Sequence, residues 1–231
     1  MNLNELAAWR PYLFHIMERR SQASARQRGL LSPVGLMHVA EQSGQCKWRW
    51  LGQDDWQQST PHDLSHTLRE FPMELQLPNE TKATLRDQHA LGGPNGLIAL
   101  QPILQDQLTP QDWLGILNNR IFLFPCCGPQ DNTLCEAGEK FRNANHPDQL
   151  TVLTILTARI PQSLQKKIQL SRINGGAING MANRGLGTYV NLGDYPNAEA
   201  NRIQEITVVG DATVDELRAC CISNWFLQVH Q

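Results

Sequence analysis

Residues 201–218 read NRIQEITVVGDATVDELR and contain a strand, a turn and the start of a helix. Apolar and β-branched residues predict a buried strand over residues 203–209, and the Gly-Asp pair after it favours a turn. Thr213 and Glu216 have the T-x-x-E spacing of a capping box, which predicts the helix start. Glu205 stands inside the strand, where an unpaired buried carboxylate costs several kcal/mol. We therefore expect Glu205 to be paired, to lie at a rim, or to serve a function.

The composition is that of a soluble globular protein. The chain has 231 residues, of which 41% are hydrophobic and 18% are charged, enough for one large domain. The net charge of −2 excludes a strong basic field for stable nucleic-acid binding, although a local patch suffices for an enzyme that touches nucleic acid briefly. No secretory signal or long apolar segment is present, so we expect a cytoplasmic protein with no membrane contact.

Helix and strand signals are mixed along the chain. Further strands are predicted at residues 12–17, 120–124, 151–160, 187–192 and 222–229. Helices are predicted at residues 5–10, 19–29, 32–42, 61–70, 109–118 and 134–143. Ser32 and Thr109 each precede a proline and are the expected N-caps, and Gly29 is the expected C-cap. Helices come early and strands late, which favours an α+β fold.

No linker divides the chain, so residues 1–231 are predicted to form a single domain. Residues 42–80 are predicted to be an irregular, tryptophan-rich insertion. Its Trp48 and Trp50 either line an acceptor site or fill a small core, and packing is the favoured interpretation.

The six cysteines include two adjacent pairs, which indicates reduced thiols. Cys126, Cys127, Cys135 and His146 are metal-ligand types. Adjacent cysteines do not easily bind one ion and no second C-x2-C pair exists, so we expect no metal site. A cysteine nucleophile with a distant histidine stays open as an alternative. Two glycine-rich stretches lack the spacing of a phosphate-binding loop.

Five short motifs occur in an order that resembles the ADP-ribosyltransferase fold. They are YLFHI…RQRGLLSP, LRDQ, LNNRIFLFP, NRGLGTYVNL and QEITVVGDATVDEL, and they extend over about residues 12–217. The set is similar to the bacterial toxin branch that includes the DarT-type DNA ADP-ribosyltransferases. The resemblance implies two small β-sheets that form a cleft for NAD, with flanking helices. It also implies NAD as co-substrate and release of nicotinamide.

The resemblance assigns the catalytic role to Glu205, whose carboxylate would stabilise positive charge on the ribose. The residues that it implies for NAD binding are His15, Arg86, Arg120, Phe122, Arg184, Thr188 and Tyr189. Of these, Tyr189 would offer a ring for stacking, and one of the arginines would neutralise the pyrophosphate. Taken singly, each residue also has a plain structural alternative, such as core packing, helix capping or a salt bridge.

Residue 203 is Ile, so the Glu/Gln-x-Glu pair of many protein-modifying members is absent. The resemblance therefore implies a nucleic-acid acceptor, DNA or RNA, and a toxin of a toxin–antitoxin or phage-defence system with a cognate antitoxin protein. Three alternatives stay open: a transferase acting on protein, an inactive binding module of the same fold, and a cysteine-dependent hydrolase.

Overall fold

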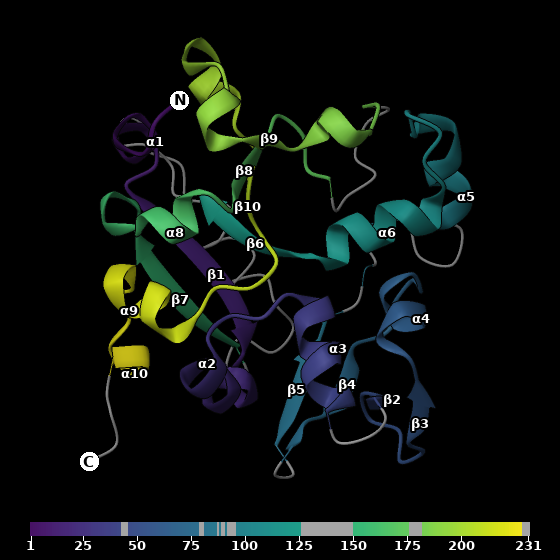
Figure 1. Ribbon diagram of the computed structural model, residues 1–231. Coiled ribbons are helices and arrows are strands. Elements are labelled where there is room, and N and C mark those ends of the chain that lie inside the picture. The colour runs from purple at the N-terminus through teal and green to yellow at the C-terminus, as the bar shows by residue number, and fades with distance from the viewer. Residues whose placement is uncertain are drawn as a thin grey trace.

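The computed structural model describes residues 1–42, 46–78, 81–86, 88, 91, 96–125, 150–175 and 182–227. It confirms the predicted α+β class, with two antiparallel sheets of six and four strands that lie side by side (Figure 1). Within these ranges, no helix combines the length and the apolar character needed to cross a bilayer.

The six-stranded sheet contains the strand that carries Glu205. Its order is β7-β1-β6-β10-β8-β9, and all neighbouring strands are antiparallel. The strands are β1 (Tyr12–Glu18), β6 (Arg120–Pro125), β7 (Leu150–Leu156), β8 (Ile168–Ser171), β9 (Val190–Asn191) and β10 (Glu205–Val209). Strands from opposite ends of the chain, β1 and β10, thus flank β6.

One face of this sheet forms the main hydrophobic core. Ile121 and Leu123 of β6 and Ile206 and Val208 of β10 alternate onto this face, so Glu205 belongs to the opposite one. Helices on the core side are α1 (Leu3–Trp9), α2 (Gln22–Arg28), α8 (Gln162–Gln165), α9 (Val214–Cys220) and α10 (Asn224–Leu227). The 3₁₀ turns of this half are η1 (Arg19–Ser21), η7 (Thr157–Arg159), η8 (Leu186–Thr188), η9 (Leu192–Asp194) and η10 (Asn197–Arg202).

The four-stranded sheet corrects the prediction of an irregular insertion at residues 42–80. Its order is β3-β2-β4-β5, and its strands are β2 (Cys46–Trp50), β3 (Gln57–Ser59), β4 (Met73–Gln76) and β5 (Lys82–Leu85). Helices α3 (Pro33–Glu41) and α4 (Pro61–Ser65) pack on it. Trp48 and Leu75 point into the core between sheet and helices, as the packing interpretation expected for Trp48. The strands are short and rich in polar residues, which hides their period of two.

A third cluster connects the two halves. It contains α5 (Gly96–Leu100), η5 (Gln101–Ile103) and α6 (Pro110–Asn118), and α6 leads directly into β6 (Figure 1). Trp113 of α6 is completely buried at its centre, against Tyr189. The cluster therefore brings a helix from the middle of the chain next to the segment before β9.

The predicted caps at Ser32, Thr109, Thr213 and Gly29 are confirmed, whereas the helix predicted at residues 61–70 ends at Ser65 and the one predicted at residues 19–29 begins with the 3₁₀ turn η1. Ser32, Thr109 and Thr213 each accept a hydrogen bond from the backbone N–H three residues later, and Thr213 and Glu216 complete the capping box. Gly29 ends α2 with a φ of +86°, a conformation that glycine adopts without steric cost.

One predicted strand is confirmed only in part and another is wrong. Residues 187–192 contain the two-residue strand β9 between 3₁₀ turns, and the described part of residues 222–229 contains the helix α10 instead of a strand. Phe226 of α10 packs in the main core. The helix predicted at residues 134–143 and the cluster of Cys126, Cys127, Cys135 and His146 lie outside the described residues.

Candidate functional site

A cavity of about 370 Å³ lies between the two sheets. One wall comes from β1, β6 and β10 and contains Phe122 and Glu205, and the other comes from β5 and contains Thr84 and Arg86. Leucines and a proline from the segment around the start of α3 and from α6 complete the apolar part of the lining. The structure thus places five of the eight predicted site residues along one cavity, namely His15, Arg86, Arg120, Phe122 and Glu205.

The cavity opens where β1 separates from β6. The two strands pair at Leu13↔Pro125 and Phe14↔Phe124, and the pairing stops there. The next residue, His15, places Nδ1 at 3.0 Å from the backbone carbonyl of Phe122, so Nδ1 carries the proton and donates it. Burial lowers the pKa of His15, and the hydrogen bond to Phe122 offsets this in part, so the ring is neutral at neutral pH. His15 thus closes the gap between the strands.

Glu205 is the first residue of β10, and its side chain is held by two neutral donors. Tyr189 donates its hydroxyl to Oε2 at 2.8 Å, and the backbone N–H of Gly175 donates to the same oxygen at 3.1 Å. Glu205 is 9% exposed and lines the cavity. The preceding Ile203 is buried in the main core, so no polar group accompanies Glu205 from the position two residues earlier.

Tyr189 is buried next to Glu205, and two side chains pack against its ring. The Trp113 ring stacks on it at a centroid distance of 6.0 Å and an angle of 18°, and the Arg120 guanidinium lies 4.3 Å from the ring centroid. Burial raises the pKa of Tyr189, and the neighbouring Glu205 carboxylate raises it further. Tyr189 is therefore a neutral hydrogen-bond donor at neutral pH. This placement does not favour the predicted role of Tyr189 as a stacking platform for the ligand.

Arg120 reaches the cavity from the start of β6. Nη1 donates to the carbonyl of Ile116 at the end of α6, as the helix-capping alternative expected, and Nη2 donates to Gln169 at 2.8 Å. Within the described part of the chain, its buried Nε has no hydrogen-bond partner. Burial lowers the pKa of Arg120, while the nearby Tyr189 and Glu205 raise it. Arg120 thus places a positive charge beside the cavity.

The remaining predicted residues have different positions. Arg86 lies at the cavity, half-exposed, 3.7 Å from Glu18 of β1. Arg184 is 1% exposed and donates to the backbone carbonyls of Ala182 and Asn174, and it does not belong to the cavity lining. Thr188 accepts a hydrogen bond from the backbone of Gly185 and fixes its own turn. The structure therefore does not bring Arg184 or Thr188 to the cavity.

Sequence reasoning did not identify the polar network on the α6 side of the cavity. The buried Arg69 donates to the Asn118 side chain at 2.8 Å and to the Arg86 carbonyl at 2.9 Å. Gln88 donates to the same oxygen of Asn118 at 3.2 Å. All four residues line the cavity. Arg69 lies in the segment that was predicted to be irregular, and no local motif distinguishes it from a surface arginine.

The described cysteines and acidic residues do not form another reactive centre. Cys46, Cys220 and Cys221 are buried free thiols, and burial raises the pKa of Cys46 to about 11 and that of Cys220 to about 12. Such thiols are poor nucleophiles at neutral pH. Across the ranges that the structure describes, no three His, Cys, Asp or Glu side chains gather in an arrangement that could hold a metal ion.

Residues 11–219 match the model of a protein family, DUF7002, which is described as a family of unknown function. The chain belongs to this family. No curated protein and no solved structure gives a significant match. The DUF7002 match includes both sheets and every residue of the cavity lining, so the cavity lies inside the region that defines the family.

Proposed function

We propose that this DUF7002 protein is an NAD-dependent mono-ADP-ribosyltransferase, and that the cavity between its sheets binds NAD. The observation that carries the proposal is the position of Glu205, whose carboxylate lines a cleft shared with Arg120 and Phe122. Residues from β1, β6 and β10 meet there although they are distant in sequence. A volume of about 370 Å³ lies within the range of small-molecule sites, and the lining combines apolar walls with a few polar groups.

The role proposed for Glu205 follows from the charge that the reaction creates. When the bond between ribose C1′ and the pyridinium nitrogen breaks, its electron pair stays on nitrogen, and neutral nicotinamide leaves. The ribose then carries an oxocarbenium-like positive charge, which a carboxylate stabilises. A lone pair of the acceptor forms the new bond to C1′, and the proton of the acceptor passes to solvent.

The other cavity residues have roles that fit the rest of the ligand. The guanidinium groups of Arg120 and Arg86 are suited to bind the pyrophosphate, because their planar donors match phosphate oxygens. The ring of Phe122 also lines the cavity and offers an apolar surface to nicotinamide. His15 is proposed to bind a ribose hydroxyl through Nε2, since Nδ1 is occupied by Phe122.

The acceptor is proposed to be nucleic acid, DNA or RNA, and the protein to act as a toxin countered by an antitoxin. Support comes from the resemblance to DarT-type enzymes and from the buried Ile203, which stands two residues before Glu205 where many protein-modifying members have Glu or Gln. Arg86, half-exposed beside the cleft, gives a polyanion one positive contact.

The test is incubation of the purified protein with NAD labelled on the adenylate, together with separate pools of DNA, RNA and protein. We expect label to enter a nucleic-acid pool and nicotinamide to be released, with both signals lost in Glu205→Ala. Label in the protein pool alone would reject the nucleic-acid acceptor but keep the transferase. A folded protein that releases no nicotinamide and binds no NAD would reject the proposal and favour the binding module.

A further inference from the structure

A closed ring of contacts lies behind the Glu205 carboxylate. The indole N–H of Trp113 donates to the carbonyl of Gly175 at 3.3 Å, and the N–H of Gly175 donates to Glu205. Tyr189 completes the ring, since its hydroxyl donates to Glu205 and its ring stacks on Trp113. Four residues from α6, the segment after β8, the segment before β9 and β10 thus share one arrangement.

The ring of Tyr189 is anchored before any ligand binds. It is 6% exposed, and both the Trp113 indole and the Arg120 guanidinium pack against it. A buried aromatic side chain packed in this way has few rotamers available, so its hydroxyl keeps one position. Because Glu205 takes its hydrogen bond from that hydroxyl, the orientation of the carboxylate depends on the position of the Tyr189 ring.

Gly175 is the second support, and its position admits no side chain. A Cβ atom built there would lie 2.2 Å from the Tyr189 hydroxyl oxygen and 3.4 Å from Glu205 Oε2. Both atoms belong to buried groups, so neither yields without moving the carboxylate. The absence of a Cβ lets the backbone N–H approach Glu205 directly, in line with the close approaches for which glycine is used.

We propose that Tyr189 is a positioning residue for the reaction, which holds Oε2 of Glu205 toward the back of the cleft and so sets where the carboxylate meets the ribose. This inference rests on the proposed function, and it replaces the stacking role expected for Tyr189. A group that acts through another affects the rate of the chemical step more than substrate binding.

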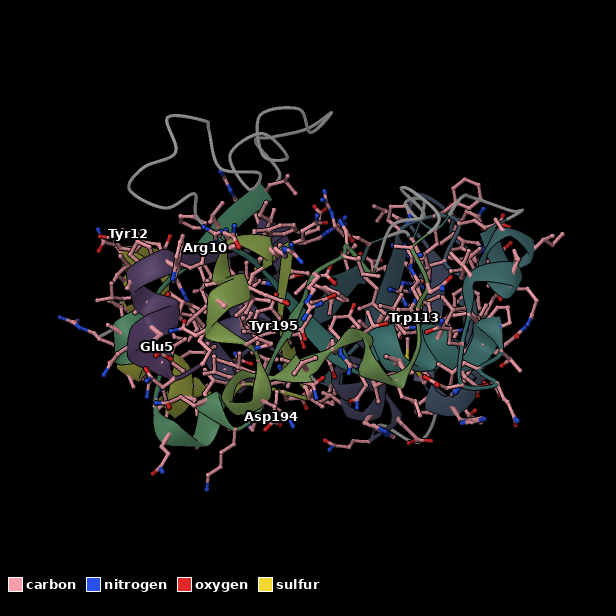
Figure 2. All side chains as sticks on the ribbon, turned by 90° about the horizontal axis from the view of Figure 1, so that it is seen from above. Glu5, Arg10, Tyr12, Trp113, Asp194 and Tyr195 are labelled. Atoms are coloured by element: carbon pink, nitrogen blue, oxygen red, sulfur yellow. The ribbon has the colours of Figure 1, made fainter. Side chains whose placement is uncertain are left out.

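Tyr189→Phe tests the proposal because it keeps the stacked ring and removes only the hydroxyl. We expect kcat for nicotinamide release to fall about 10- to 100-fold, while KM for NAD stays within about twofold. Tyr195→Phe is the matched control, since Tyr195 is also buried and its hydroxyl contacts the Glu199 backbone at 3.4 Å and the Arg172 side chain, neither of which lines the cavity. Figure 2 shows Tyr195 well apart from Trp113, on the side of the six-stranded sheet. The control should keep kcat within about twofold.

A double-mutant cycle on the unfolding equilibrium tests the contact between Tyr189 and Glu205 without measuring activity. We expect the changes in unfolding constant caused by Tyr189→Phe and Glu205→Gln to be non-additive in the double variant, because both act on one hydrogen bond. Tyr195→Phe should combine additively with Glu205→Gln. Gly175→Ala is the second structural variant, and it should also reduce kcat, because its methyl group displaces the Tyr189 hydroxyl.

The possible outcomes distinguish a positioning role for Tyr189 from a ligand-binding role and from the absence of the proposed function. Additive effects at Tyr189 and Glu205, or a Tyr189→Phe protein with unchanged kcat, would overturn the positioning role. A rise in KM with unchanged kcat would restore the role in ligand binding. Non-additive unfolding in a parent protein that releases no nicotinamide would confirm the contact, but it would reject both the proposed function and the positioning role within it.

Discussion

Two buried glutamates, Glu74 and Glu205, lie in the described strands, and their surroundings differ. Glu74 of β4 is 3% exposed, with Arg49 at 2.7 Å, Lys82 at 3.4 Å and Arg20 at 3.5 Å. Glu205 of β10 is also buried, but it takes hydrogen bonds from a tyrosine hydroxyl and a backbone N–H. One carboxylate forms ion pairs with three cations, and the other lines a cavity, accepts hydrogen bonds from two neutral donors and interacts with the charges of Arg120 and Arg184.

The partners of a buried carboxylate show what it is used for. The cations around Glu74 cancel its charge. One of them, Arg20 of η1, connects the segment that follows β1 to the four-stranded sheet. Burial raises the pKa of Glu74, but Arg49 and Lys82 outweigh this and hold the pKa below its usual range. Two neutral donors orient Glu205, Arg120 and Arg184 lie near enough to interact with its charge, and its side chain lines the cavity where a ligand would meet it. Glu74 therefore serves stability, and Glu205 is available for chemistry.

The sharpest test of this comparison is Glu205→Gln, for which we expect the largest effect. Gln keeps the shape and an oxygen acceptor for Tyr189 but removes the negative charge. We expect kcat/KM for nicotinamide release to fall about 1,000-fold, in the range found when a transition-state charge loses its stabilising group. The free energy of unfolding should change only by the charge assistance that the Tyr189 hydrogen bond loses. The matched variant Glu74→Gln should keep kcat/KM within about threefold at a temperature where it is folded. Equal losses in the two variants would remove the distinction between the glutamates.

Glu74→Gln should give the reverse result, a loss of stability. Removal of the carboxylate leaves three cations close together, and we expect the free energy of unfolding at pH 7 to fall by about 2 kcal/mol. Because the folded pKa of Glu74 is lowered, its contribution is present above about pH 4.5 and is lost as the pH falls through the folded pKa. The gap between parent and variant in urea unfolding should therefore close at acidic pH. A gap that persists there would mean that packing, and not charge, explains the loss.

Arg120→Lys tests the cavity that Glu205 lines, and we expect a smaller effect than that of Glu205→Gln. Lys keeps the charge but loses the planar group that lies over Tyr189 and donates to Gln169. We expect KM for NAD to rise about tenfold, equal to about 1.4 kcal/mol of binding free energy. Arg159→Lys, at an exposed residue of η7, is the control and should leave KM unchanged. If Arg120→Lys lowers kcat alone, Arg120 supports Glu205 rather than the pyrophosphate.

The sequence predicted those features of the fold that depend on neighbouring residues. The caps at Ser32, Thr109 and Thr213 need partners only three residues away, and all three are present. The strands β2, β4 and β5 were missed because their apolar faces are only two or three residues long, and β3 was missed because it has no apolar residue. Such strands are stable only once α3 covers them, which is a tertiary effect.

The candidate site likewise has some features that are visible in the sequence and others that depend on long-range contacts. A lone carboxylate in an apolar strand is visible in the sequence, and so is the aromatic strand that contains Phe122. The contact of Gly175 with Glu205 spans 30 residues, and that of Trp113 with Gly175 spans 62. No periodicity connects residues at such distances, so the supports of Glu205 could not be predicted. Glu74 likewise resembles Glu205 in sequence, and only its three cations distinguish it.

The smallest effect is expected from His15→Asn, which tests whether the junction of β1 and β6 is a pH-dependent part of the first sheet. Because burial lowers the folded pKa of His15 below 6.5, the unfolded chain binds a proton more readily. The stabilising difference is fully present above about pH 6.5 and decreases as the pH falls toward the folded pKa. Asn keeps a donor for the Phe122 carbonyl and cannot titrate.

The free energy of unfolding should therefore fall less for His15→Asn than for the parent between pH 7.5 and pH 5, by roughly the proton linkage of one group. Urea unfolding at several pH values measures this difference directly. Other titrating groups, including Glu74, are common to both proteins and cancel in the comparison. A parallel pH dependence would show that His15 titrates as in the unfolded chain. The gap between β1 and β6 would then be open to solvent, and His15 would face water instead of closing the cleft.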